Sequence, residues 1–110
     1  MIHIIRERAT EEQVREMLEA LQTYIKLAVD IRRRVVAGGG GMHADCEAVL
    51  LEDGSRQADV WGAGWVPEGQ EVRFESLINI RPQQQNRSMT IEDRTLRTSV
   101  EQIVRERIQR

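Results

Sequence analysis

The first apolar positions of the chain are spaced as they are on an α-helix. Four of them recur at i, i+3, i+4 and i+7 among charged neighbours: Val14, Met17, Leu18 and Leu21. This spacing gives a helix one hydrophobic face. Thr10 and Gln13 come before this stripe at the separation of a capping box, in which each side chain bonds the backbone N–H of the other residue. The pattern therefore predicts a helix over residues 11–22.

From residue 25 onward the period changes to two. Residues 25–31 alternate between apolar and polar side chains, which is typical of a strand with one buried face. Arginines at 32–34 separate this segment from the apolar run 35–37, a distance that fits a hairpin although no glycine or asparagine marks the turn. Alternation also predicts strands over 57–66 and 71–81, and the second of these is the clearest strand of the chain.

Two tryptophans share one face of the 57–66 segment. Trp61, Ala63 and Trp65 fall on one side, and Gly62 and Gly64 fall on the other. Glycines opposite large side chains are typical of a bulged or bent strand. We assign both tryptophans to the hydrophobic core, and the alternative is an exposed pair that marks a dimer or ligand surface.

Residues 38–53 combine glycine, histidine, cysteine and carboxylates as no other segment does. Four glycines are followed by His43, Asp45, Cys46 and Glu47 and then by apolar residues. We interpret this segment as a glycine bend that leads into a strand over 43–51. On such a strand the histidine and the two carboxylates share one face, and the cysteine lies on the other, where we expect it to be buried.

The last apolar stripe predicts a second helix over residues 94–108. Its members again follow helical spacing: Leu96, Val100, Ile103, Val104 and Ile108. A short β-rich run at residues 2–5 adds an edge strand. Because strands joined by short turns pair antiparallel, we expect an α+β fold. It consists of an antiparallel meander sheet of four to five strands, with the two helices (11–22 and 94–108) on one face. A length of 110 residues fits a single domain, 1–110.

Composition narrows the choice of compartment and partners. The formal charge of −2 and the pI near 5.7 make nucleic acid an unlikely partner, so we interpret Arg32, Arg33 and Arg34 as a solvated turn, with an anion or nucleic-acid contact as the alternative. The chain has one cysteine and no long apolar run, and its start lacks the apolar core of a secretory signal. We therefore expect a cytoplasmic protein with no membrane contact.

Three sequence motifs carry a resemblance to a known family. They are KLAVDI at 26–31, AGGG followed by MHADCEAVLLEDGS at 42–55, and ESLINIRP followed by NRSM at 75–89. The chain resembles a small family of uncharacterised bacterial proteins, mainly from cyanobacteria, with no assigned activity. The resemblance implies a cytosolic single domain and supplies no catalytic or binding residues.

The first candidate site consists of His43, Asp45 and Glu47. Alternate side chains on a strand lie about 6–7 Å apart, so these three groups can converge on one ion. Non-haem iron sites of this kind need a second histidine downstream, and the only other histidine is His3, which lies upstream. We therefore expect no metal and no cofactor, and we expect these side chains to bond arginines or backbone.

The second candidate site lies at the end of the 71–81 segment and in the loop that follows. Asn79, Arg81, Asn86 and Arg87 supply amide and guanidinium donors, which suit a phosphate or carboxylate. A small anionic ligand is one interpretation of this group. The other interpretation is that Arg81 or Arg87 pairs with a carboxylate of the first site and holds the loop over the sheet.

These observations lead to two functional hypotheses. The leading one is a small cytosolic, non-catalytic binding or assembly protein that forms a homodimer, because two helices on one sheet face leave the other face to be covered. Leu77, an apolar residue on the polar side of its segment, supports self-association. The alternative is a small hydrolytic or metal-dependent enzyme that uses His43, Asp45 and Glu47, with Arg81 or Arg87 stabilising an anion.

Overall fold

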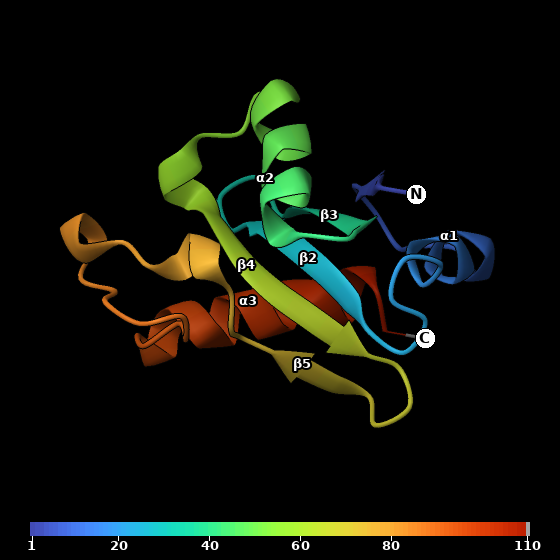
Figure 1. Cartoon of the computed structure of the whole chain (residues 1–110). Helices are drawn as coiled ribbons and strands as arrows, with labels where there is room; N and C mark the ends of the chain where they lie inside the picture. Colours follow the sequence, from blue (N-terminus) through green and yellow to red (C-terminus); the bar gives the residue numbers. More distant parts are fainter. Residues whose placement is uncertain (110) are drawn as a thin grey trace.

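The computed structural model, which describes residues 1–109, contains one open antiparallel sheet of five strands (Figure 1). The strands are β1 (His3–Ile5), β2 (Ile25–Asp30), β3 (Val35–Gly40), β4 (Val60–Val66) and β5 (Glu71–Arg73). Their order in the sheet is β1-β3-β2-β4-β5. The α+β fold is therefore confirmed. The strand order differs from that of a simple meander, because the chain leaves the sheet after β3 and returns beside β2.

Helices cover both faces of this sheet. α1 (Glu11–Met17) and α3 (Arg94–Arg107) contribute to the same hydrophobic cluster on one face, and α2 (His43–Glu52) packs on the opposite face. The predicted capping box is present, with 2.9 and 3.1 Å hydrogen bonds between Thr10 and Gln13. α1 ends at Met17, earlier than predicted, and the chain then turns through Gln22 at a φ of 68°.

The segment predicted as a strand over 43–51 is the helix α2. Its buried side chains, Cys46 and Leu50, are four residues apart, and Ala48 between them is exposed, which fits one helical turn and not the alternation of a strand. Exposed alanines and leucine in the segment favour a helix, and Gly54 adopts a φ of 105° directly after the C-cap residue Asp53, as glycine commonly does at a helix end. The Asp53-Gly54 pair thus ends a helix and not a strand.

The hairpin between β2 and β3 forms as predicted, and Asp30 supplies its turn signal. The Oδ1 atom of Asp30 accepts 2.9 Å hydrogen bonds from the backbone N–H groups of both Arg32 and Arg33, which is the Asx-turn arrangement. Arg34 takes the positive φ of 58° that a glycine would otherwise occupy. The side chain of Asp30 therefore stabilises a turn that contains no glycine or asparagine.

The arginines of this turn bind carboxylates of the same chain. Arg33 lies 2.7 Å from Asp53, and Arg34 lies 2.6 Å from Glu106. Arg6 also contacts Asp53 at 2.7 Å, and the hydrogen bonds from both arginines lower the pKa of Asp53 to about 2. The turn therefore connects the hairpin to the C-terminal ends of α2 and α3, which accounts for two of its three charges.

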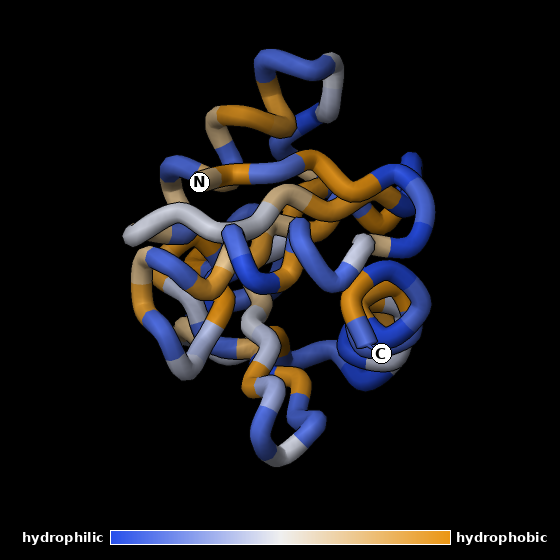
Figure 2. Tube along the Cα trace, turned by 90° about the vertical axis from the view of Figure 1, so that its right-hand side faces the viewer, coloured by the Kyte–Doolittle hydropathy of each residue, from blue (hydrophilic) through white to orange (hydrophobic). Residues whose placement is uncertain are grey.

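Two hydrophobic clusters lie on the two faces of the sheet. The larger one lies between the sheet and α1 and α3 and contains Trp61, Ala63 and Trp65, so the assignment of both tryptophans to the core is confirmed. The smaller one lies under α2 and contains Cys46, which is fully buried as predicted. Figure 2 shows the apolar positions running through the middle of the molecule, with hydrophilic segments around them.

No helix within residues 1–109 has the length and apolar character needed to span a bilayer.

The segment 71–81 is a strand only over its first three residues. Buried and exposed side chains still alternate up to Ser76, and the backbone of residues 74–76 is hydrogen bonded to Met89 and Ile91. Beyond this point the chain forms two short 3₁₀ turns, Leu77–Asn79 and Pro82–Gln84. The predicted strand is therefore wrong over residues 77–81, and residues 74–76 are joined to residues 89–91 by an isolated antiparallel bridge, Glu75–Thr90, outside the named strands. This region and the residues up to 92 form a folded loop beyond the end of β5, which we call the 74–92 loop.

Candidate functional site

Asn79 lies at the centre of the 74–92 loop and is fully buried. Its Oδ1 atom accepts from the backbone N–H of Gly62 at 2.7 Å, and its Nδ2 atom donates to the carbonyl of Gly62 at 3.0 Å. The same amide nitrogen lies 3.2 Å from the carbonyl oxygens of both Phe74 and Met89. The side chain thus continues the hydrogen bonding of β4 beyond β5 and connects both ends of the loop to the sheet.

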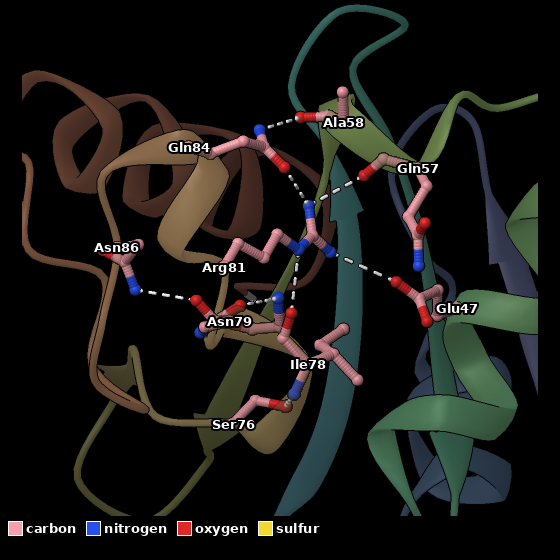
Figure 3. Close-up of polar contacts among 10 residues, drawn as sticks. Glu47, Gln57, Ala58, Ser76, Ile78, Asn79, Arg81, Gln84 and Asn86 are labelled. Atoms are coloured by element: carbon pink, nitrogen blue, oxygen red, sulfur yellow. Dashed lines mark hydrogen bonds and ion pairs between the residues drawn. The ribbon is translucent and has the colours of Figure 1, made fainter.

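Arg81 extends this network toward α2, as Figure 3 shows. Its guanidinium donates to the backbone carbonyls of Ile78 at 2.9 Å and Gln57 at 2.8 Å, and it contacts Glu47 at 3.1 Å. The group also lies 4.7 Å from the ring centre of Trp61. Burial lowers the pKa of Arg81, and the Glu47 carboxylate acts against this effect. This ion pair of Arg81 with Glu47 is the one given in the sequence analysis as the alternative to anion binding.

Asn86 and Arg87 occupy different environments. Asn86 is buried and donates through Nδ2 to the carbonyl oxygens of Asn79 at 2.8 Å and Thr90 at 2.9 Å, and its Oδ1 accepts from the N–H of Glu92. Arg87 is exposed, and its backbone N–H donates to the Glu92 carboxylate. Asn79, Arg81 and Asn86 therefore form one internal network, and Arg87 lies outside it.

Substitution of Arg81 by lysine is expected to lower the free energy of unfolding by about 2 kcal/mol. Lysine keeps the charge, but a single ammonium cannot donate to Ile78, Gln57 and Glu47 in the directions that the planar fork reaches, so the partly buried hydrogen bonds to these carbonyls are lost. Urea denaturation measures the change. Arg87→Lys is the matched control on the exposed side of the same loop, and equal stabilities of the two variants would contradict this role of Arg81.

The first candidate group, His43, Asp45 and Glu47, does not converge on one point. On α2 His43 and Glu47 share a face, whereas Asp45 points into solvent. Glu47 is bound to Arg81, and the Nε2 atom of His43 lies 2.8 Å from the carbonyl oxygen of Ala63. Within residues 1–109 no group of three or more histidine, cysteine or acidic side chains is arranged to hold a metal ion.

The surroundings of His43 favour the neutral form of its ring. Burial lowers its pKa below 6.5, Lys26 lowers it further, and the hydrogen bond to Ala63 acts in the opposite direction. Because a carbonyl oxygen can only accept, the proton of the neutral ring is on Nε2, and Nδ1 is left with its lone pair. His43 therefore presents a neutral imidazole.

This imidazole lies at the wall of a cleft of about 370 Å³, which we call the α2 cleft. The start of β2 contributes Tyr24 and Lys26, the start of α2 contributes residues 42–44, and the 74–92 loop contributes residues 75–78 and Met89. The Tyr24 ring packs against β4 at Gly64, where a Cβ atom would overlap it. The cleft thus lies between three segments that are far apart in the sequence.

Large apolar side chains are exposed around the α2 cleft. Leu77 is 71% exposed, Met42 59% and Met89 44%, and all three line it. Elsewhere in the described chain only Met1, Leu51 and Ile80 are comparably exposed apolar residues. An adjoining hollow of about 500 Å³ is lined by Ile80, Arg81, Glu47 and several glutamines, but its charged groups are already bonded to each other. The α2 cleft is therefore the better candidate for a binding site.

Sequence reasoning did not identify most of this cleft. Leu77 was noted as an apolar residue among polar ones and taken as support for self-association. His43 was named as a member of a candidate catalytic or metal-binding group. Tyr24, Lys26, Met42 and Met89 were missed, because their sequence separation hides their proximity. One available signal was Lys26, the single lysine in a chain with fifteen arginines.

Comparison with known proteins identifies a family. A family model described as "Protein of unknown function (DUF5674)" matches residues 3–107. No curated protein and no solved structure matches the sequence. The resemblance to an uncharacterised family with no assigned activity is thereby confirmed.

Proposed function

The chain belongs to this family of proteins of unknown function, and we propose that it is a non-catalytic binding protein whose α2 cleft takes a small molecule. The observation that supports the proposal is the gathering of exposed Leu77, Met42 and Met89 around one concave surface. Contiguous exposed apolar side chains are typical of binding sites. Methionine side chains adapt to different ligand shapes.

The size of the cleft favours a small molecule over a macromolecule. Ligand pockets measure roughly 300–1,000 Å³ and are lined mostly by apolar groups with a few polar ones, and about 370 Å³ lies at the lower end of this range. The polar groups here are those of Tyr24, Lys26, His43, Glu75 and Ser76. The catalytic alternative finds less support, because His43 and Glu47 each already bond a group of the protein.

Self-association and a cytoplasmic location stay predictions. The reason first given for a homodimer was an uncovered sheet face, and α2 occupies that face. The remaining support is the exposed Leu77. Sedimentation at high protein concentration tests the homodimer. A strict monomer would contradict it, and the exposed apolar residues would then be explained only by ligand binding.

Binding in the α2 cleft is expected to depend on Leu77. A set of small apolar and amphiphilic compounds is titrated into the ¹⁵N-labelled protein, and the backbone signals of residues 42–44 and 75–78 are expected to shift. Leu77→Ser is expected to weaken binding about tenfold, which corresponds to removal of a buried aliphatic contact. Leu51→Ser is the matched control, because Leu51 is exposed on α2 away from the cleft. Absence of binding by the whole set, or shifts confined to other regions, would contradict the proposal.

A further inference from the structure

Lys26 is the one basic side chain among the residues that line the α2 cleft, apart from the neutral His43. Its Nζ atom donates to the carbonyl of Gly41 at 3.1 Å, which holds the ammonium near the start of α2. None of the ion pairs formed among residues 1–109 includes Lys26. An ammonium has three donors, so two of its N–H groups are available to a ligand.

The start of α2 adds a second source of positive potential on the same side of the cleft. The N-cap residue is Met42, and no side chain caps this helix end. The first backbone N–H groups of a helix have no partner within it, and they carry the positive end of the helix dipole. His43 and Ala44, which supply these groups, both line the cleft. The ammonium and the helix end together favour an anion here.

The other residues that line the α2 cleft restrict the polarity and the charge of the rest of the ligand. Leu77, Ile78, Met42 and Met89 form an apolar wall, which suits a hydrocarbon or aromatic body. Glu75 is the one carboxylate that lines the cleft, and it disfavours a second negative charge on the ligand through like-charge repulsion. The lining thus matches a molecule with one anionic end and an apolar remainder.

We propose that the ligand of the α2 cleft is a small monoanionic amphiphile, of the class of medium-chain or aromatic carboxylates, with its carboxylate on Lys26 and its apolar body against Leu77 and Met89. This inference rests on the proposed function and deepens it by naming the ligand class. A carboxylate forms charge-assisted hydrogen bonds with the ammonium, and these are stronger than bonds between neutral groups.

The test compares three probes that share one chain and differ in their head group: octanoate, 1-octanol and octylammonium. Each is titrated below its aggregation concentration into ¹⁵N-labelled protein at neutral pH. Octanoate is expected to bind about tenfold more tightly than octanol, and octylammonium more weakly than either. Lys26→Met is expected to remove the preference, so that octanoate binds no more tightly than octanol, and Lys26→Arg is expected to restore it.

The outcomes separate this inference from the proposed function. Binding of octanol at the cleft with no preference for octanoate, or a preference that persists in Lys26→Met, overturns the ligand class and leaves a binding cleft in place. Absence of binding by all three probes and by the wider compound set overturns both. Unchanged ¹⁵N spectra of Lys26→Met outside residues 24–28 and 41–44 confirm that the variant is folded, so that loss of the preference reports on the charge.

Discussion

Replacement of Gly39 by alanine is expected to lower the free energy of unfolding by about 3 kcal/mol or more. Gly39 adopts a φ of 106° in β3, a conformation that costs an L-residue roughly 1–3 kcal/mol. An added Cβ atom would in addition overlap the carbonyl oxygen of Met1 and lie 3.0 Å from the Cα atom of Met17. Both neighbours are backbone atoms, so the strain cannot be relieved by a change of rotamer. Urea denaturation followed by circular dichroism measures the loss.

The glycine run provides its own control for this prediction. Gly41 lies two residues away, its φ is not positive, and no atom lies within 4 Å of where its Cβ would be. Gly41→Ala is therefore expected to change stability by less than about 0.5 kcal/mol, with a small gain from reduced freedom of the unfolded chain. Similar losses in both variants would show that the run acts by general flexibility and not by close packing at Gly39.

The parts of the fold that the sequence predicted are those in which local pattern and tertiary packing agree. The helix over 94–107 and the strand over 25–30 have long, regular apolar stripes, and each stripe faces the larger core cluster. Trp61 and Trp65 were assigned correctly for the same reason. In these segments the period alone determines which side chains are buried.

The errors come from short segments in which two periods fit the same residues. Cys46 and Leu50 satisfy an alternating pattern as well as a helical one, since a separation of four is even and also close to one helical turn. The alternation after Glu71 likewise continues to Ser76, but the chain then turns because Asn79 takes over the hydrogen bonds that a strand would make with Gly62. A side chain that replaces backbone pairing leaves no periodic signal.

The candidate site was only partly predictable for a related reason. Asn79, Arg81 and Asn86 were recognised as a polar group, and their chemistry suits an external anion as well as internal carbonyls. Their burial and their hydrogen bonds to the Gly62 and Gln57 backbones are tertiary features, which the residue types alone do not indicate. The same internal hydrogen bonds shape the α2 cleft, because they position the turn that carries Leu77.

Replacement of Asn79 by alanine is expected to lower the free energy of unfolding by about 4 kcal/mol. The substitution leaves the N–H and C=O of Gly62 and the carbonyls of Phe74 and Met89 without this partner in a buried site, and a buried polar group without a partner costs roughly 1–3 kcal/mol. A loss of this size is a large fraction of the stability of a small protein. Thermal and urea denaturation measure it.

The control for Asn79→Ala is Gln83→Ala, an exposed amide in the same loop, which is expected to change stability by less than about 0.5 kcal/mol. Because Asn79 connects the loop to β4, Asn79→Ala is also expected to increase amide hydrogen exchange over residues 75–90 more than in β2 or α3. Ligand binding at the α2 cleft is expected to weaken in the fraction that stays folded, since Leu77 loses its fixed position. Uniform loss of protection across the chain would instead show that Asn79 stabilises the whole fold and has no local effect on the cleft.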